Sequence, residues 1–182
     1  MDNKLGGGWG AGFEVNIEEA YTFLSNNYDQ GDEIFIFGFS RGASQARSLC
    51  TLIDWAGGFP SKNDVYYLPR IFSAFLEARG QGDVSTLLDG INERRLKRND
   101  SPLDPFIVPD ITFLGVWDTV LALGSRIQAR DGSSNEKYQF HTPPVPASML
   151  TTVRHGLAID ERRHDFQAEL FSGSGTCQDF EQ

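Results

Sequence analysis

The residue best suited to covalent chemistry is the serine of the segment Gly38-Phe39-Ser40-Arg41-Gly42, which two glycines flank. A Gly-x-Ser-x-Gly segment between a strand and a helix holds the serine at a tight turn that lifts its hydroxyl clear of the sheet. We expect a Cβ atom at Gly38 or Gly42 to collide with the neighbouring strand and helix. The N–H of Arg41, at the helix N-terminus, would point toward a developing oxyanion. The pattern predicts a nucleophile at Ser40. The alternative is a plain strand-to-helix turn that Ser40 caps.

Asp118 is the second candidate for chemistry. It directly follows the apolar segment 110–117, and active-site residues collect at the carboxyl ends of strands in open α/β sheets. It also follows Ser40 in the chain order serine, acid, histidine that such sites use. We therefore expect Asp118 to orient a histidine. The alternative is that Asp118 caps the turn that it begins.

A histidine base is harder to find among the three in the sequence, His141, His155 and His164. His141 lies in a polar, proline-rich segment, His155 precedes an apolar stretch with helical spacing, and His164 follows a run of charges. None follows a recognisable buried strand. We expect surface or hydrogen-bonded histidines rather than a catalytic one.

The elements around the Gly-x-Ser-x-Gly segment have the pattern of an α/β sheet. Apolar residues recur at helical spacing from about Glu14 to Asn26, which predicts a helix. Residues 33–38 are apolar on both faces and rich in Ile and Phe, which is typical of a strand buried in a parallel sheet. Residues 40–57 return to helical spacing. Helix, buried strand, sharp turn and helix together predict an α/β fold.

The remaining segments give weaker secondary-structure patterns. The glycine-rich residues 1–12 and the polar residues 172–182 predict loops. The other expected elements are helices at 68–79, 83–98 and 149–159, a buried strand at 110–117, and a long polar excursion at 125–148.

The bulk composition excludes several classes of protein. The net charge of −9 argues against a nucleic-acid partner, because phosphate binding needs clustered Lys and Arg. No apolar run approaches a membrane span and no signal peptide is recognisable, so the default location is cytoplasmic, with signal-independent export the alternative. Cys50 and Cys177 predict neither a disulfide framework nor a metal site, and Cys50 is expected to be a buried free thiol.

Three blocks of sequence resemble the DUF2235 family, also described as the Tle1-like phospholipase effector domain of type VI secretion. The first runs from Asn16 through the serine segment to Leu49. The second is Phe113-Leu114-Gly115-Val116-Trp117-Asp118-Thr119-Val120, and the third is His155-Gly156-Leu157-Ala158-Ile159-Asp160-Glu161-Arg162-Arg163. The resemblance covers nearly the whole chain.

The resemblance implies a partial α/β-hydrolase fold over residues 1–182, a mostly parallel sheet flanked by helices, cut at both ends. It assigns the nucleophile to Ser40 and the acid to Asp118, in a triad that needs no cofactor or metal. The family's histidine lies in a later Gly-Val-His-Ser-Asp segment, so the base is expected beyond Gln182, with His155 a weak alternative. The third block is expected to form a helix salt-bridged to the core.

The implied activity is hydrolysis of carboxylic esters, with a small-molecule or lipid ester as substrate and phospholipids as one such class. The alternative is a catalytically inactive hydrolase-like fragment or a binding module.

Overall fold

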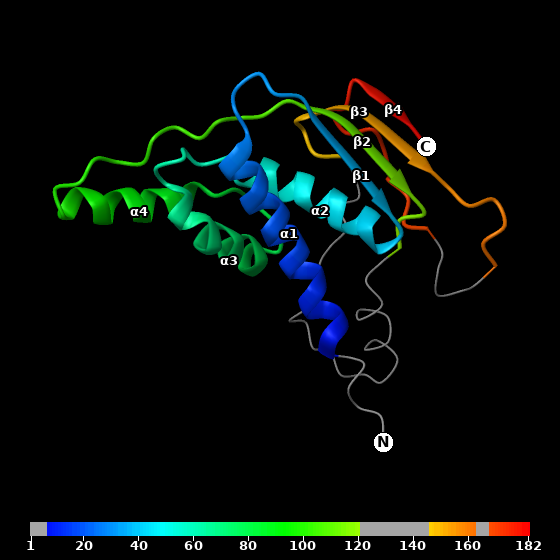
Figure 1. Ribbon diagram of the computed structural model, residues 1–182, viewed down its shortest axis with the longest axis horizontal. Coiled ribbons are helices and arrows are strands. Elements are labelled where there is room, and N and C mark those ends of the chain that lie inside the picture. The colour runs from blue at the N-terminus through cyan, green and yellow to red at the C-terminus, as the bar shows by residue number, and fades with distance from the viewer. Residues whose placement is uncertain (1–6, 121–145, 163–167) are drawn as a thin grey trace.

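The computed structural model describes residues 7–120, 146–162 and 168–182 of the chain. Its centre is a four-stranded sheet in the order β1-β2-β3-β4, and each strand is parallel to its neighbours (Figure 1). The strands are β1 (Ile34–Phe39), β2 (Ile111–Trp117), β3 (Leu150–Gly156) and β4 (Asp179–Glu181). Because all four are parallel, their carboxyl ends share one edge of the sheet.

The helices lie on one side of this sheet (Figure 1). They are α1 (Gly7–Asn27), α2 (Arg41–Trp55), the short 3-10 helix η1 (Val65–Tyr67), α3 (Leu68–Ala78) and α4 (Ser85–Lys97). Helix α2 lies directly on β1, and α1 packs against α2. This arrangement makes the chain an α/β protein. None of the helices in the described ranges has the length and apolarity needed to cross a membrane.

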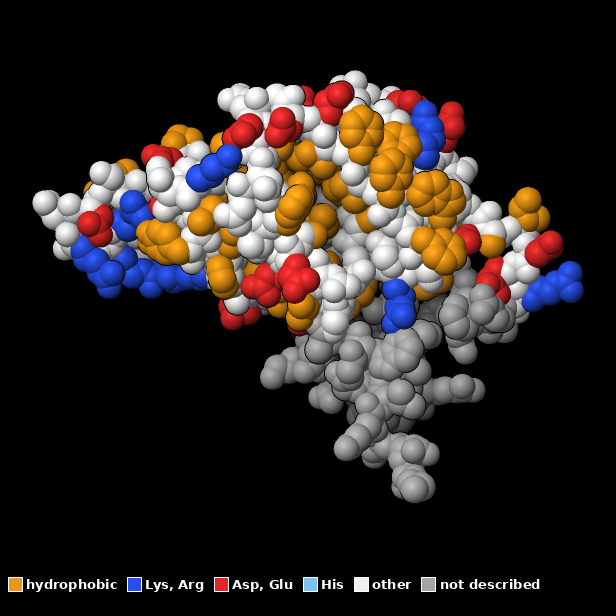
Figure 2. All heavy atoms as spheres, viewed as in Figure 1, with side chains coloured by type: hydrophobic (Ala, Val, Ile, Leu, Met, Phe, Trp, Pro, Cys, Tyr) orange, Lys and Arg blue, Asp and Glu red, His pale blue; other side chains and the backbone are white. Residues whose placement is uncertain are grey.

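The strand register separates a buried face from an exposed one. Ile36, Leu114 and Val153 are adjacent across β1, β2 and β3, and all three are buried in the hydrophobic core. The other face carries an aromatic surface on β1 and β2 that remains largely uncovered (Figure 2). We call it the aromatic face, and it consists of Phe35, Phe37, Phe39, Phe113 and Trp117.

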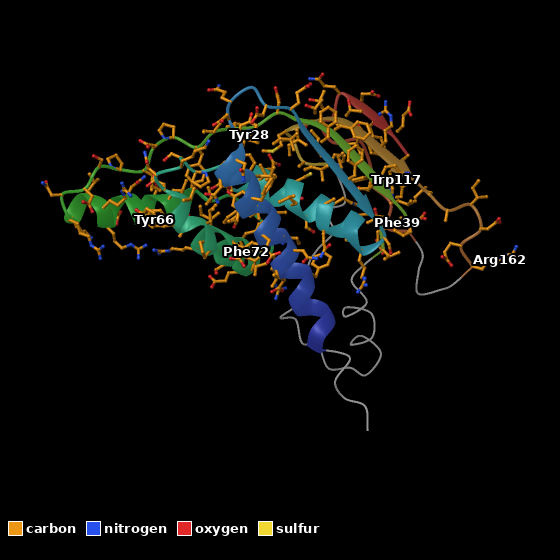
Figure 3. All side chains as sticks on the ribbon, in the orientation of Figure 1. Tyr28, Phe39, Tyr66, Phe72, Trp117 and Arg162 are labelled. Atoms are coloured by element: carbon orange, nitrogen blue, oxygen red, sulfur yellow. The ribbon has the colours of Figure 1, made fainter. Side chains whose placement is uncertain are left out.

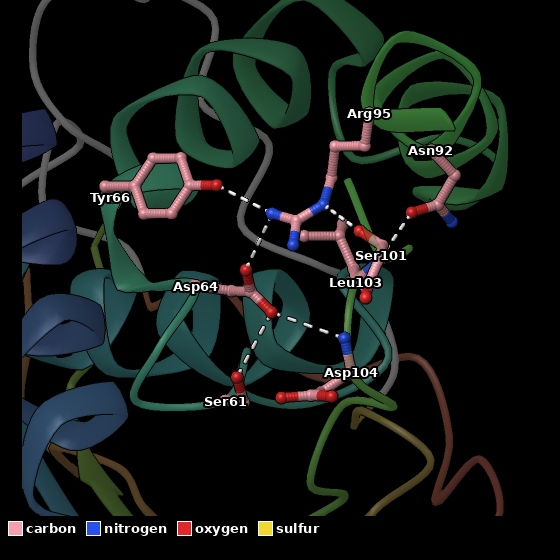
Figure 4. Close-up of polar contacts among 8 residues, drawn as sticks. All are labelled: Ser61, Asp64, Tyr66, Asn92, Arg95, Ser101, Leu103 and Asp104. Atoms are coloured by element: carbon pink, nitrogen blue, oxygen red, sulfur yellow. Dashed lines mark hydrogen bonds and ion pairs between the residues drawn. The ribbon is translucent and has the colours of Figure 1, made fainter. Parts of the chain in front are cut away.

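Helices α3 and α4 are joined to the rest of the fold by a polar cluster around Asp64, whose residue is 3% exposed. Its carboxylate accepts hydrogen bonds from the Ser61 hydroxyl at 3.1 Å and the Asp104 N–H at 3.3 Å, and pairs with Arg95 of α4 at 3.1 Å (Figure 4). Arg95 also donates to the Tyr66 hydroxyl at 2.7 Å. One buried carboxylate thus ties η1, α4 and the segment before β2 together.

Several sequence expectations hold and others are wrong. The expected strands at 33–38 and 110–117 and the helices at 40–57, 68–79 and 83–98 are confirmed within two residues at each end. The expected helix at 149–159 is wrong, because its centre is strand β3. The expected loop at 172–182 contains β4, and the excursion at 125–148 lies almost entirely outside the described residues.

The first helix starts earlier than its sequence predicts. Phe13, Ile17 and Tyr21 are spaced four residues apart and are all buried, so the inward stripe of α1 begins before Glu14. The backbone continues as helix back to Gly7. The part of the predicted glycine-rich loop that the structure describes is therefore helical.

Candidate active site

Ser40 occupies a sharp turn between β1 and α2. Its backbone angles, φ 56° and ψ −120°, are rare for a residue with a side chain. Its N–H donates to the carbonyl of Trp117 at 2.8 Å, which continues the β1–β2 ladder up to the turn. Ser40 is the N-cap residue of α2 by position, but its side chain makes no capping hydrogen bond to the helix. Backbone strain at a half-buried serine next to a helix N-terminus is the geometry of a nucleophile elbow.

The two glycines of the segment differ in their surroundings. A Cβ atom at Gly38 would lie 2.5 Å from the carbonyl oxygen of Gly42 and 2.7 Å from the Cα of Ala43. Glycine at position 38 therefore permits the close approach of β1 to α2. A Cβ atom at Gly42 would meet nothing within 4 Å, so the expected collision there is wrong.

Asp118 forms a second strained turn, at the end of β2, with φ 46°. Its N–H donates to the Gly156 carbonyl at 3.0 Å, and its Oδ1 accepts a hydrogen bond from the Ala158 N–H. The carboxylate thus anchors the segment after β3 and does not cap its own turn. Oδ2 has no hydrogen-bond partner among the described residues, which leaves one carboxylate oxygen for a further donor.

The two turns are in direct contact. The Ser40 carbonyl accepts a long hydrogen bond from the Val120 N–H at 3.5 Å, and the Ser44 hydroxyl of α2 donates to the Val120 carbonyl. Phe39 and Trp117, which precede the two turns, lie at the same end of the sheet (Figure 3). The fold therefore places Ser40 and Asp118 beside each other, as their positions after parallel strands predict.

His155 lies on β3, and its residue is 4% exposed. One ring nitrogen, Nε2, is 3.2 Å from the Thr119 hydroxyl, and the other, Nδ1, is 3.0 Å from Oε1 of Gln182. Burial lowers the pKa of the imidazole, an effect that Arg47 reinforces while the Gln182 hydrogen bond and Asp118 oppose it. The expectation that His155 precedes a helix is wrong. His141 and His164 lie outside the described residues.

The third sequence block does not form the expected salt-bridged helix. It starts in β3, and from Leu157 the described residues have no regular secondary structure. Asp160 and Arg162 are exposed, and Arg162 projects away from the sheet (Figure 3). Asp160 is nevertheless an exposed carboxylate four residues beyond the end of β3, which makes it a control for Asp118.

Sequence reasoning missed the buried residues behind Asp118. Thr119 is fully buried and Arg47 of α2 is 2% exposed. The Arg47 guanidinium stacks over the Phe171 ring at 3.7 Å and donates to the Glu169 carbonyl at 2.6 Å. Burial lowers the pKa of Arg47 to about 10, and Glu169 opposes this. No spacing in the sequence links Arg47, Thr119 and Phe171, because they come from three distant segments.

Cysteine and metal chemistry have little support in the described residues. Cys50 is a buried free thiol, as expected, and burial raises its pKa to about 12. Cys177 is also free. Within residues 7–120, 146–162 and 168–182, no three His, Cys, Asp or Glu side chains cluster in a way that could hold a metal ion.

A parallel α/β sheet with a serine elbow at its carboxyl edge defines a hydrolase-like domain. The chain belongs to the family of Tle1-like phospholipase effectors of type VI secretion, whose catalytic-domain pattern matches residues 1–182. It is also 26% identical, over 174 residues, to an uncharacterized protein of Saccharomyces cerevisiae. That match covers 94% of this chain and 23% of the yeast protein, so the chain spans about a quarter of its relative. No solved structure matches the chain.

Proposed function

We propose that this domain hydrolyses carboxylic esters through an acyl-enzyme on Ser40, with phospholipids as the substrate class. The observation that carries the proposal is the strained backbone of Ser40 between a buried strand and a helix N-terminus. Such strain persists where the surrounding structure holds it, and it exposes the hydroxyl to an incoming carbonyl. The lipid substrate class rests on the family description.

In the proposed reaction, Ser40 Oγ attacks the ester carbonyl and loses its proton to a base. The N–H of Arg41 stabilises the oxyanion, the alcohol leaves with a proton, and water then hydrolyses the acyl-serine. Asp118 orients the imidazole of the base through Oδ2, since Oδ1 is held by the Ala158 N–H. His155 does not fit the role of base, because its ring nitrogens contact Thr119 and Gln182 and not Ser40 and Asp118. The base therefore comes from outside the described residues.

Chemical rescue tests the nucleophile and the acid together. The family resemblance assigns the base to a segment that follows residue 182, so we expect the 182-residue chain to hydrolyse p-nitrophenyl butyrate very slowly, because a triad without its base loses about a millionfold in turnover. Added imidazole would supply the base and accelerate fluorophosphonate labelling of Ser40, read by peptide mass spectrometry, by about tenfold or more. Ser40→Ala should abolish the labelling.

Asp118→Asn and Asp160→Asn form the matched pair for the acid. We expect Asp118→Asn to remove most of the acceleration by imidazole and Asp160→Asn to leave it intact. Labelling that persists at another serine in Ser40→Ala, or no labelling of Ser40 with or without imidazole, would overturn the enzymatic proposal and favour a binding module. Equal effects of the two asparagine variants would remove Asp118 from the mechanism.

A further inference from the structure

The orientation of the Gln182 amide is set by the main chain of Phe171. The Phe171 N–H donates to Oε1 at 2.7 Å, and Nε2 of the amide donates to the Phe171 carbonyl at 3.3 Å. In the opposite orientation, the amide NH2 group would face the Phe171 N–H and the amide oxygen would face the Phe171 carbonyl, so neither hydrogen bond could form. Oε1 is therefore the atom that faces His155.

This orientation determines the tautomer of His155. Since Oε1 can only accept, the Nδ1 atom 3.0 Å away must carry a proton. Burial lowers the pKa of the ring, and although the Gln182 hydrogen bond and Asp118 oppose it, the net shift is downward, which favours the neutral ring at pH 7. Nε2 is then an acceptor, and the Thr119 hydroxyl 3.2 Å away is its donor.

Thr119 connects this chain of hydrogen bonds to the candidate acid. It directly follows Asp118, it is fully buried, and its carbonyl accepts the Glu169 N–H at 2.6 Å. The neighbouring residues of the turn are held by the main chain at Gly156 and Ser40. The Thr119 hydroxyl is thus the side-chain link from the Asp118 turn to β3 and to the segment that ends at Gln182.

We propose that Thr119 and His155 are positioning residues, which hold Asp118 in its strained turn through the chain Thr119 hydroxyl to His155 Nε2 and His155 Nδ1 to Gln182. The role of this chain in catalysis rests on the proposed function; its existence and direction do not. It assigns His155 a function other than that of the base. It also makes the placement of Asp118, at the end of β2, depend on Gln182, which is 64 residues away in sequence and follows β4, two strands across the sheet.

The direction of this chain of hydrogen bonds is tested first, by nuclear magnetic resonance on the 182-residue protein. Long-range proton–nitrogen correlations of the imidazole should show His155 as the Nδ1–H tautomer at pH 7. In Thr119→Val, whose side chain has nearly the same shape without the hydroxyl, we expect that signature to change. A dominant Nε2–H tautomer in the unaltered protein would overturn the proposal.

The positioning of Asp118 is tested with the same variants. The Ala158 N–H reports on the Asp118 carboxylate, so Thr119→Val should increase its hydrogen exchange by about tenfold or more and reduce the imidazole acceleration of Ser40 labelling severalfold. Thr119→Ser, which keeps the hydroxyl, should restore both. Thr152→Val, on the opposite face of β3, is the matched control and should change neither.

The two proposals fail in different ways. If Ser40 never labels but Thr119→Val still releases the Ala158 N–H, the proposed function fails and the positioning role stands. If Ser40 labels with imidazole and Thr119→Val matches the unaltered protein in exchange and labelling, the positioning role is overturned. Failure of Thr119→Ser to restore the exchange would equally overturn it, because packing rather than the hydroxyl would then matter.

Discussion

Gly38 and Gly42 make different steric demands although both flank Ser40. Gly38→Ala would place a methyl group 2.5 Å from the Gly42 carbonyl oxygen. The atoms in the way belong to the backbone, so the methyl group fits only if the main chain of β1 or α2 shifts. We expect a loss of about 1–3 kcal/mol of unfolding free energy, as in other overpacked sites. Urea unfolding followed by tryptophan fluorescence measures this loss, and the Ser40 turn should lose its reactivity with it.

Gly42→Ala is the matched control at the residue scale. Position 42 lies in the first turn of α2, and a Cβ atom there meets nothing within 4 Å. Since alanine favours helix over glycine by about 1 kcal/mol, we expect this variant to be neutral or slightly more stable. A Gly42→Ala variant as unstable as Gly38→Ala would show that the close approach seen at Gly38 is not what selects glycine.

At the scale of elements, the Asp64 cluster decides whether α4 stays docked. Asp64→Ala removes the acceptor of Ser61, Arg95 and the Asp104 N–H from a buried position. Because the Arg95 side chain is 20% exposed and can regain water, we expect a loss of about 2–3 kcal/mol, below that of a fully buried pair. Chemical denaturation gives the total, and hydrogen exchange should show the loss concentrated in α4.

Lys62→Ala is the control for a salt bridge without burial. Lys62 pairs with Asp29 at 2.6 Å, but the two side chains are 51% and 77% exposed. Such pairs contribute about 1 kcal/mol or less, so this variant should unfold almost like the unaltered protein. If the two variants cost the same, burial of Asp64 would not be the source of its contribution.

At the scale of the whole molecule, the described residues leave the aromatic face and the edge strand β1 uncovered. Phe37 and Phe39 on the aromatic face are 61% and 67% exposed, whereas parallel sheets are usually covered on both faces. Strand β1 also forms an uncharged edge beside a groove of about 650 Å³ that α1 and α2 line. The opposite edge, β4, is short and carries Asp179 and Glu181, as protected edges do.

The exposure of the aromatic face predicts that the protein self-associates through this face. Phe37→Lys would place a charge at the centre of the aromatic face, and we expect it to reduce the associated fraction severalfold in sedimentation velocity. Leu96→Lys adds the same charge at a residue 61% exposed on α4 and should change little. Equal effects of both variants would attribute any change to net charge and not to the aromatic face.

The sequence by itself determined the local features of this protein. The apolar strands before Ser40 and Asp118, the elbow and the neighbouring helices follow from patterns within about twenty residues, because local periodicity and turn chemistry specify them. Parallel strands then brought Ser40 and Asp118 to one edge, as predicted.

Only the tertiary structure decided the rest. Leu150–Gly156 is too short for its periodicity to separate helix from strand, and pairing with β2 made it a strand. That outcome buried His155 and gave both of its ring nitrogens partners from distant segments. Hydrogen bonds between segments far apart in the chain leave no spacing in the sequence, so the residues that hold Asp118 became visible only in the fold.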